Sequence, residues 1–341
     1  MENHHKKAAK QQSETATTTT VSKTNLFGKV ALLVNSGDKN VPFIEILEVL
    51  KNKNIDVSVV DVLEHGFSLL DRKIWQDFSR VFIAITSENK LSLGYIQGLL
   101  DILGLEYTGC GMLAAALAGD LIKSKKIWQM HGIATAPFIK WKSDLNWEEM
   151  ISLIGFPLAI KSVYLNDSKI FKVLQMSQLA EVLEKFDNLN DIIIEPWVAG
   201  EEYVVYIVNN KPLFPLRIDN YIVSEPELTT KICKNHAKQL ILNNEQNNLQ
   251  KLALEAYLAL GCSGVAGVNI IKDLNNDCWV VAVNTAPVIS FNSHFAAAAY
   301  NFGINFDVLV EQILATSLKK NCHLGNESGG KGIWWMKDCL T

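Results

Sequence analysis

The sequence has no excess of positive charge and no long apolar run. Its 341 residues include 32 Lys and Arg against 36 Asp and Glu, which gives a formal net charge of −4. Proteins that bind nucleic acid carry a basic patch or stripe, and this balance gives no sign of one. A membrane-spanning helix needs ~18 or more consecutive apolar residues, and no run approaches that length. We therefore expect neither a nucleic-acid partner nor a membrane span.

Closely spaced cysteines are also missing. Zinc and redox sites commonly place cysteines in CxxC pairs, and no such pair occurs here. The lysines Lys6, Lys7 and Lys10 precede a Ser/Thr-rich run, where a signal peptide would have its apolar core. We expect a cytoplasmic protein with reduced thiols at its six cysteines, which are Cys110, Cys233, Cys262, Cys278, Cys322 and Cys339.

The composition is that of an ordinary globular protein, with 48% apolar and 20% charged residues. The length is enough for two or three domains. Residues 1–24 are polar and include four consecutive threonines, so they are predicted to form a disordered tail. Residues 321–341 show no clear period and are predicted to form a C-terminal tail.

The pattern of apolar residues predicts an α/β protein. Short apolar runs at 29–34, 56–60 and 80–85 alternate with a helical pattern at 43–50, which is typical of a parallel sheet. We expect one long helix from about 112 to His131, and a hairpin at 203–218 that turns at Asn209-Asn210. The predicted divisions are an N-terminal α/β domain (25–119), a small central domain (120–198) and a C-terminal domain (199–320).

Two apolar segments near the C-terminus are the most informative. Residues 264–271 and 278–284 are predicted to form adjacent strands joined by a short polar turn. The second strand ends in Asn-Thr-Ala-Pro at 284–287.

This hairpin resembles the metal-binding hairpin of the D-alanine–D-alanine ligases, a branch of the ATP-grasp enzymes. Other segments are similar to the same family, in the same order, over roughly residues 29–318. The resemblance implies an ATP-grasp fold behind an N-terminal parallel α/β domain, with ATP and Mg²⁺ as cofactors and a homodimeric assembly. The segments are 97–98, 107–118, 194–203, 260–262 and 284–287.

At the metal and oxyanion positions of the family, this sequence carries other residues. Asn269 and Ala282 stand where the family has carboxylates, and Gly267 stands where it has an Arg. Only Asn284 is retained among the metal positions. Mg²⁺ prefers hard oxygen ligands and is usually held by one or two carboxylates. We therefore do not expect Mg²⁺ to bind, and whether ATP binds stays open.

The phosphate contacts implied by the family are also changed. Leu121 follows Asp120 where the family has a Lys, and Lys123 and Lys125 are predicted to lie off that face. The segment 162–168 contains no glycine, although a glycine-rich loop would let backbone N–H groups approach phosphate. Substrate contacts implied by the family are not recognisable in three further segments, 36–42, 86–87 and 219–242.

Six family positions are retained besides Asn284, and several of these residues have a structural alternative. The resemblance implies that Lys161, Glu195, Trp197 and Glu202 hold the nucleotide, that Arg217 contacts the transferred phosphoryl group, and that Ser293 contacts substrate. Lys161 could instead cap a strand edge, and Glu195 and Trp197 could form a packed core junction. Glu202 could be a solvated carboxylate, Arg217 could pair with Asp219 or Glu225, and Asn284 could be a turn residue.

Three hypotheses follow. The first is a catalytically silent or severely impaired ligase-like protein, with a binding or regulatory role linked to peptidoglycan precursor synthesis, as a homodimer or as partner of an active ligase. The second is an active ATP-dependent D-alanine–D-alanine or related dipeptide ligase, with Asp273 or Asp277 as repositioned metal ligands. The third is a protein that binds nucleotide without catalysis.

Overall fold

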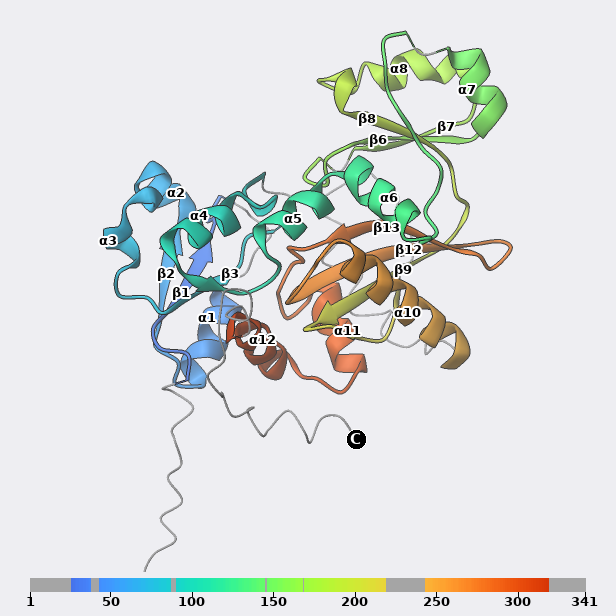
Figure 1. The fold of residues 1–341 in the computed structure, drawn as a ribbon. Helices are drawn as coiled ribbons and strands as arrows, with labels where there is room; N and C mark the ends of the chain where they lie inside the picture. The colour runs from blue at the N-terminus through green and yellow to red at the C-terminus, as the bar shows by residue number, and fades with distance from the viewer. Residues whose placement is uncertain are drawn as a thin grey trace, which may run out of the picture.

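The computed structural model describes residues 26–37, 43–86, 90–144, 146–167, 169–218 and 243–318. Both predicted tails and the segment 219–242 lie outside these residues. Figure 1 shows three sheets, with the N-terminal sheet on one side, the C-terminal sheet on the other, and the central sheet standing above the latter. None of the described helices combines the length and apolarity needed to cross a membrane.

The N-terminal sheet is parallel, as predicted. Its order is β2-β1-β3-β4, and every residue of β1 is buried, which is typical of a strand covered on both faces. The strands are β1 (Val30–Val34), β2 (Val57–Asp61), β3 (Arg80–Ile83) and β4 (Glu106–Tyr107). The helices are α1 (Phe43–Asn52), α2 (Val62–His65), α3 (Arg72–Trp75) and α4 (Tyr95–Leu103), with 3₁₀ turns η2 (Gly66–Leu70) and η3 (Lys90–Ser92).

The central sheet is antiparallel and has its own core. Its order is β5-β8-β6-β7, and Met150, Leu158 and Val173 are among its buried residues. The strands are β5 (Ile139–Lys140), β6 (Leu158–Ser162), β7 (Ile170–Val173) and β8 (Ile192–Pro196). The helices are α7 (Trp147–Ile154) and α8 (Leu179–Leu183), with 3₁₀ turns η4 (Met176–Gln178) and η5 (Leu189–Asp191).

The C-terminal sheet is antiparallel and contains both predicted hairpins. Its order is β10-β9-β12-β13, and β11 also pairs with β9. Asn209 and Asn210 have φ angles of 54° and 66°, which suit a type I′ hairpin turn. The strands are β9 (Gly200–Val208), β10 (Lys211–Pro212), β11 (Leu216–Ile218), β12 (Val265–Asp273) and β13 (Cys278–Asn284). The helices are α10 (Asn243–Ala259), α11 (His294–Asn301) and α12 (Phe306–Ala315).

The prediction of one long helix up to His131 is wrong. The segment forms two helices, α5 (Met112–Gly119) and α6 (Leu121–Met130), which are separated by Asp120. Asp120 has extended backbone angles (φ −109°, ψ 104°), and its side chain accepts a hydrogen bond from the Lys123 amide at 3.0 Å. An aspartate in this position is a favoured helix N-cap, so the break is also the start of α6.

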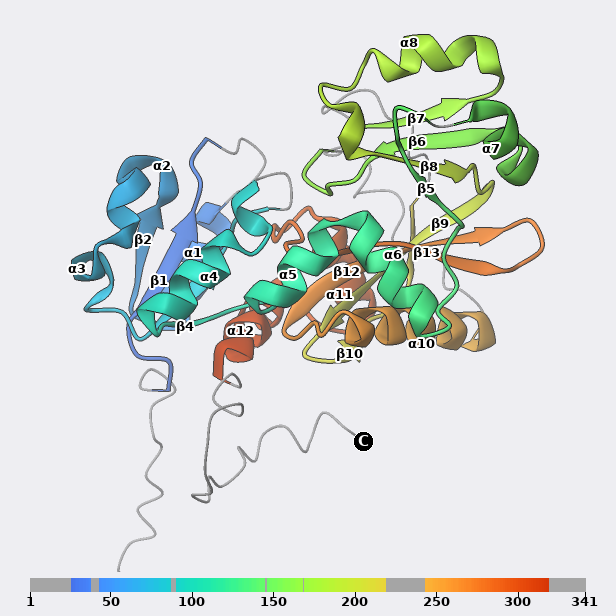
Figure 2. The ribbon, with the colours of Figure 1, turned by 45° about the horizontal axis from the view of Figure 1, so that its top comes forward.

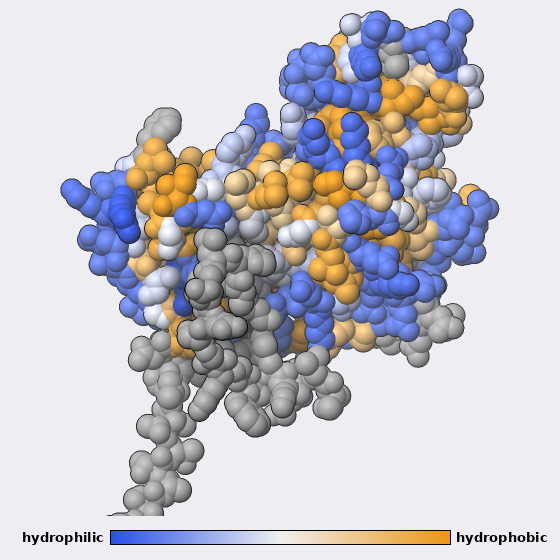
Figure 3. Space-filling model, viewed as in Figure 1, coloured by the Kyte–Doolittle hydropathy of each residue, from blue (hydrophilic) through white to orange (hydrophobic). Residues whose placement is uncertain are grey.

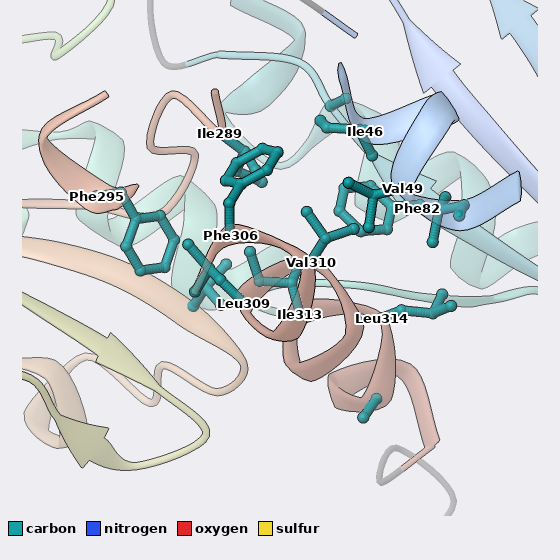
Figure 4. Packing of buried hydrophobic residues seen from close by; sticks show 14 of the residues in the cluster. Ile46, Val49, Phe82, Ile289, Phe295, Phe306, Leu309, Val310, Ile313 and Leu314 are labelled. Carbon is teal, nitrogen blue, oxygen red and sulfur yellow. The ribbon is translucent and has the colours of Figure 1, made fainter. Parts of the chain in front are cut away.

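One apolar core joins the N-terminal and C-terminal sheets. Ile46 and Val49 of α1 and Phe82 of β3 belong to the same buried cluster as residues of α12 (Figure 4). The contributions of α12 include Leu309, Val310, Ile313 and Leu314. The central sheet stands over β13 and α6 in both ribbon views (Figures 1 and 2), and the site lies on this side of the molecule.

Candidate functional site

Two adjoining cavities lie between the central sheet and the β12–β13 hairpin. The larger has a volume of about 410 Å³ and the smaller about 190 Å³. Their walls have five residues in common, so the two cavities meet along one boundary. These residues are Lys161, Ile170, Glu202, Ile271 and Val281.

A buried ion cluster forms one side of the larger cavity. Nζ of Lys161 lies 2.7 Å from Oε2 of Glu195, and Nζ of Lys125 lies 3.1 Å from Oε1 of Glu195. Lys125 also donates hydrogen bonds to Oγ1 of Thr135 (2.7 Å) and to the Ala136 carbonyl (3.2 Å). The three charged side chains are between 1% and 10% exposed.

The prediction that Lys125 lies off the helix face of Leu121 is wrong. Lys125 follows Leu121 by four residues, so both side chains are on the same face of α6. Leu121 lines the smaller cavity and Lys125 lines the larger one. The spacing of four was an available signal in the sequence, because Leu121 and Lys125 also share a face on the single long helix that was predicted.

Burial and charge oppose each other at Glu195. Burial alone would raise the pKa of the Glu195 carboxyl, but Lys161 and Lys125 outweigh burial and lower it. Burial also lowers the pKa of Lys125 to about 8, although Glu195 opposes that shift. Each oxygen of the Glu195 carboxylate is thus paired with one lysine, Oε2 with Lys161 and Oε1 with Lys125.

The rest of the larger cavity is mainly apolar. Its wall includes Ala159, Phe171 and Val281, together with Trp197. Nζ of Lys172 lies 4.8 Å from the centre of the Trp197 ring, in a cation–π contact. A mainly apolar cavity with a few polar groups is typical of a small-molecule site.

Glu202 of β9 lies at the boundary between the two cavities. Burial raises the pKa of its carboxyl group, and the nearby Lys161 opposes this shift. A ligand in the larger cavity that extends toward the smaller one must therefore pass this carboxyl group.

The smaller cavity contains the positions where the sequence predicted altered metal ligands. Asn269 of β12 is paired with Ala282 of β13, and Gly267 is paired with Asn284. Oδ1 of Asn284 accepts a hydrogen bond from the Ala286 amide at 2.9 Å, as a turn residue does. Within the described ranges, no group of three or more His, Cys, Asp or Glu residues is placed to hold a metal ion. This donor set does not fit Mg²⁺, which prefers carboxylate oxygens.

Apolar packing occupies one side of the smaller cavity. Leu121 and Ala282 belong to one buried cluster with Val163 and Ile193, and Leu165 packs against it. The backbone between Val163 and Leu165 is attached to the start of α6. The Leu121 amide donates to the Val163 carbonyl (2.8 Å), and the Leu165 amide donates to the Gly119 carbonyl (3.1 Å). The segment after Lys161 is thus held by backbone hydrogen bonds and apolar contacts.

Three other predicted residues are not among those that line the two cavities. Arg217 forms an ion pair with Glu201 at 2.7 Å, and its suggested partners Asp219 and Glu225 are outside the described residues. Ser293 is the N-cap of α11, where it accepts from the Ala296 amide at 3.1 Å. Asp273 lies at the β12–β13 turn and accepts from Nε1 of Trp279 at 3.0 Å. Neither Arg217 nor Ser293 nor Asp273 lines either cavity.

The structure brings the remaining predicted residues together. The larger cavity holds Lys161, Glu195, Trp197 and Glu202, and the smaller one holds Asn269, Ala282 and Asn284 beside Lys161 and Glu202.

This arrangement of three sheets is the ATP-grasp fold behind an N-terminal parallel domain. The fold is similar to that of the D-alanine–D-alanine ligase from Bacillus anthracis complexed with ATP, with a TM-score of 0.72 and 25% identity. The similarity covers 86% of this chain and 98% of that one. The ligase from Coxiella burnetii has the same fold, with a TM-score of 0.66, 16% identity, and coverage of 86% and 96%.

Sequence comparison identifies the family. Residues 127–315 match the family model for the C-terminus of D-alanine–D-alanine ligase, so the chain belongs to the D-alanine–D-alanine ligase family. The chain is 29% identical over 311 residues to the ligase of Psychrobacter sp. (strain PRwf-1), covering 88% of this chain and 92% of that protein. It is 29% identical over 315 residues to the ligase of Acinetobacter baylyi, covering 89% and 100%.

Proposed function

We propose that this protein is a ligase-like member of its family that no longer catalyses ligation. Its role is binding or regulation in the cytoplasm, linked to peptidoglycan precursor synthesis. The observation that carries the proposal is the buried apolar contact cluster of Leu121 and Ala282. These two positions are where the family resemblance implies a phosphate-binding Lys and a metal carboxylate.

The chemistry of ligation explains why this packing matters. An acyl phosphate forms from a carboxylate and ATP, and negative charge accumulates while it forms. A bound metal ion stabilises such charge by several kcal/mol, and each ~1.4 kcal/mol changes the rate tenfold. Asn269 offers a neutral amide in place of a carboxylate, and Asn284 already accepts a backbone hydrogen bond. Neither residue supplies the charge that Mg²⁺ requires.

The larger cavity supports retained binding of the nucleotide base. Its mainly apolar wall includes Glu195, whose carboxylate is paired with Lys125 and Lys161. An adenine amino group would donate to such a carboxylate. ATP, which is bound in the related Bacillus anthracis structure, therefore fits the larger cavity through its base, whereas the smaller cavity does not fit its metal-bound phosphates.

The test is D-alanine-dependent phosphate release from MgATP at high protein concentration. We expect no release above the EDTA control, while an active ligase of the family gives a strong signal under the same conditions. Metal-dependent release by this protein would overturn the proposal. It would favour the alternative of an active ligase with repositioned ligands.

The same assay on the combined variant Gly267→Arg, Asn269→Asp and Ala282→Glu is a second arm of this test. We expect no rescue, because a Cβ atom on Gly267 would lie 3.0 Å from Cε1 of Tyr206. The Tyr206 ring is stacked on Phe295 with centroids 4.6 Å apart, so it cannot give way easily. Leu121 would also still occupy the start of α6. Appreciable turnover would show that the site needs only these three residues.

We also propose that the protein acts as a homodimer or as partner of an active ligase. Large apolar side chains are exposed on neighbouring helices of the N-terminal half, and Figure 3 shows apolar surface in this region. Replacing Ile102 and Leu113 by Lys is expected to abolish self-association, as measured by sedimentation velocity. If the partner is an active ligase, the same variant should no longer co-purify with it. A wild-type protein that stays monomeric and binds no ligase would contradict this. The exposed residues are Tyr95, Ile102, Met112, Leu113 and Met130.

A further inference from the structure

We infer that the central sheet and the C-terminal sheet form one rigid body before any ligand binds, held together by a buried apolar cluster at their junction. Domains within one chain move relative to each other by default, unless the interface between them is large and hydrophobic. Three kinds of contact cross the junction here, and they are apolar, backbone and ionic. The inference goes beyond the proposed function, because it concerns motion at the site. The junction cluster consists of Leu121, Ile122, Val163, Ile193 and Ala282.

Helix α6 is fixed to the C-terminal part of the chain, so it is a reference for motion of the central sheet. Nε1 of Trp128 on α6 donates to the Ala256 carbonyl of α10 at 3.1 Å. Trp128 is fully buried and belongs to the same apolar cluster as Val268 and Val283 of the C-terminal sheet. The central sheet stands over α6 in both ribbon views (Figures 1 and 2). A contact between α6 and the central sheet therefore crosses the junction.

The junction cluster contains residues from three separate parts of the fold. Leu121 and Ile122 come from α6, and Ala282 comes from β13. Val163 follows β6 and Ile193 lies in β8, so both move with the central sheet. All five residues are at most 8% exposed. A hinge motion of the central sheet would return this apolar surface to water, which opposes the motion.

Backbone hydrogen bonds cross the junction beside this cluster. The first amides of a helix have no acceptor within the helix. At the start of α6 the Leu121 amide donates instead to the Val163 carbonyl at 2.8 Å, and the Leu165 amide donates to the Gly119 carbonyl at 3.1 Å. Asp120 forms an isolated antiparallel β-bridge with Tyr164 between these two bonds. A hinge motion would have to break both bonds.

One buried ion pair also crosses the junction. Nζ of Lys125 on α6 lies 3.1 Å from Oε1 of Glu195 on β8, with side chains 1% and 3% exposed. Lys161 is on β6, so its pair with Glu195 stays within the central sheet. Opening the junction would separate Lys125 from its carboxylate, and a buried charge without its partner is strongly unfavourable. The walls of both cavities are therefore in place before a ligand arrives, and binding needs no closure of the central sheet.

The experiment is hydrogen–deuterium exchange of the full chain without nucleotide, resolved to single amides by NMR. The Leu121 and Leu165 amides report on the junction, because their hydrogen bonds cross it. The Val163 amide is the reference, because it donates to the Asp191 carbonyl at 2.8 Å within the central domain. We expect the two crossing amides to be protected to within about tenfold of the Val163 amide, since one body opens as one cooperative unit. A greater deficit at the crossing amides would show a hinge and overturn the inference, and so would exchange of all three at the rate of an unstructured peptide.

The Leu121→Ser variant tests the junction cluster directly. It should lower protection of the Leu165 amide at least about tenfold relative to the Val163 amide, because it removes a buried leucine from the junction. The matched control is Leu179→Ser, since Leu179 is also the first residue of a helix, is also 6% exposed, and belongs to the core of the central sheet. The control should lower protection of both amides alike.

An equal ratio of the two protection factors in both variants would contradict the role of the junction cluster. If Leu121→Ser fails to fold, the comparison of amides in the wild-type protein decides. D-alanine-dependent phosphate release would overturn the proposed function but not this inference, which depends only on exchange without nucleotide.

Discussion

The Glu195→Gln variant is expected to lose about 3–5 kcal/mol of unfolding free energy at pH 7, because it leaves two buried lysines without their carboxylate. Lys125 and Lys161 both pair with Glu195, and their side chains are at most 10% exposed. Burial has already lowered the pKa of Lys125 to about 8. Lys125 can therefore release its proton in the variant, which places the loss at the lower end of this range.

The pH dependence of this loss has a definite sign. The folded-state pKa of Glu195 lies below its ordinary value near 4.5. Its stabilisation is therefore complete above that value and is lost as the pH falls through the folded-state pKa. The difference in unfolding free energy between wild type and Glu195→Gln should be largest near pH 7 and should shrink as the pH falls below 4.5. Urea unfolding curves of both proteins, measured at each pH, test this.

A matched control uses an exposed ion pair. Glu181 pairs with Lys185 at 3.1 Å, with side chains 74% and 45% exposed. Glu181→Gln should change the unfolding free energy by less than about 1 kcal/mol. If Glu195→Gln were equally mild, the buried cluster would not stabilise the site as we argue.

The Gly264→Ala variant is expected to lose about 2–4 kcal/mol of unfolding free energy. Gly264 has a φ angle of +73°, which disfavours any residue with a Cβ atom by roughly 1–2 kcal/mol. A Cβ atom would also lie 2.6 Å from the carbonyl oxygen of Gly109 and 2.7 Å from its carbon. Relief of such overpacking costs a further ~1–3 kcal/mol, because the neighbour is backbone.

Gly261→Ala separates the two contributions. Gly261 has a φ angle of +70°, but a Cβ atom there would meet nothing within 4 Å. The Gly261→Ala variant should therefore lose only about 1 kcal/mol of unfolding free energy, from the strained backbone conformation alone. The measurement is chemical denaturation of both variants side by side. Equal losses would mean that the contact between Gly264 and Gly109, which joins the C-terminal and N-terminal parts of the chain, does not constrain the fold.

Secondary structure was largely predictable because it depends on neighbouring residues. The apolar run of β1 indicated a buried parallel strand, and Asn209-Asn210 indicated a tight hairpin turn. The break at Asp120 was missed because the flanking residues have no proline and continue a helical pattern. The break has a partly long-range cause, since the backbone of Asp120 forms an isolated antiparallel β-bridge with Tyr164 of the central domain.

The site was predictable in part. The sequence predicted the hairpin, but the pairing of Asn269 with Ala282 and of Gly267 with Asn284 depends on a β-bulge after Asn269, where the register shifts by one residue. The ion pair of Arg217 did not follow, because its partner Glu201 lies on another strand, β9. Ser293 instead has a local role, since it caps α11 by accepting from the Ala296 amide three residues later.

The sequence by itself determined the parallel N-terminal sheet, the paired strands of the hairpin and the residue types at the metal positions. These are properties of single segments or of adjacent strands, and local periodicity is sufficient to read them. Only the tertiary structure decided that Lys125 shares Glu195 with Lys161, and that Leu121 joins Ala282 in an apolar cluster. The physical reason is that ion pairing and apolar burial act between side chains from α6, β6, β8 and β13, which become neighbours only after the central sheet packs over the C-terminal one.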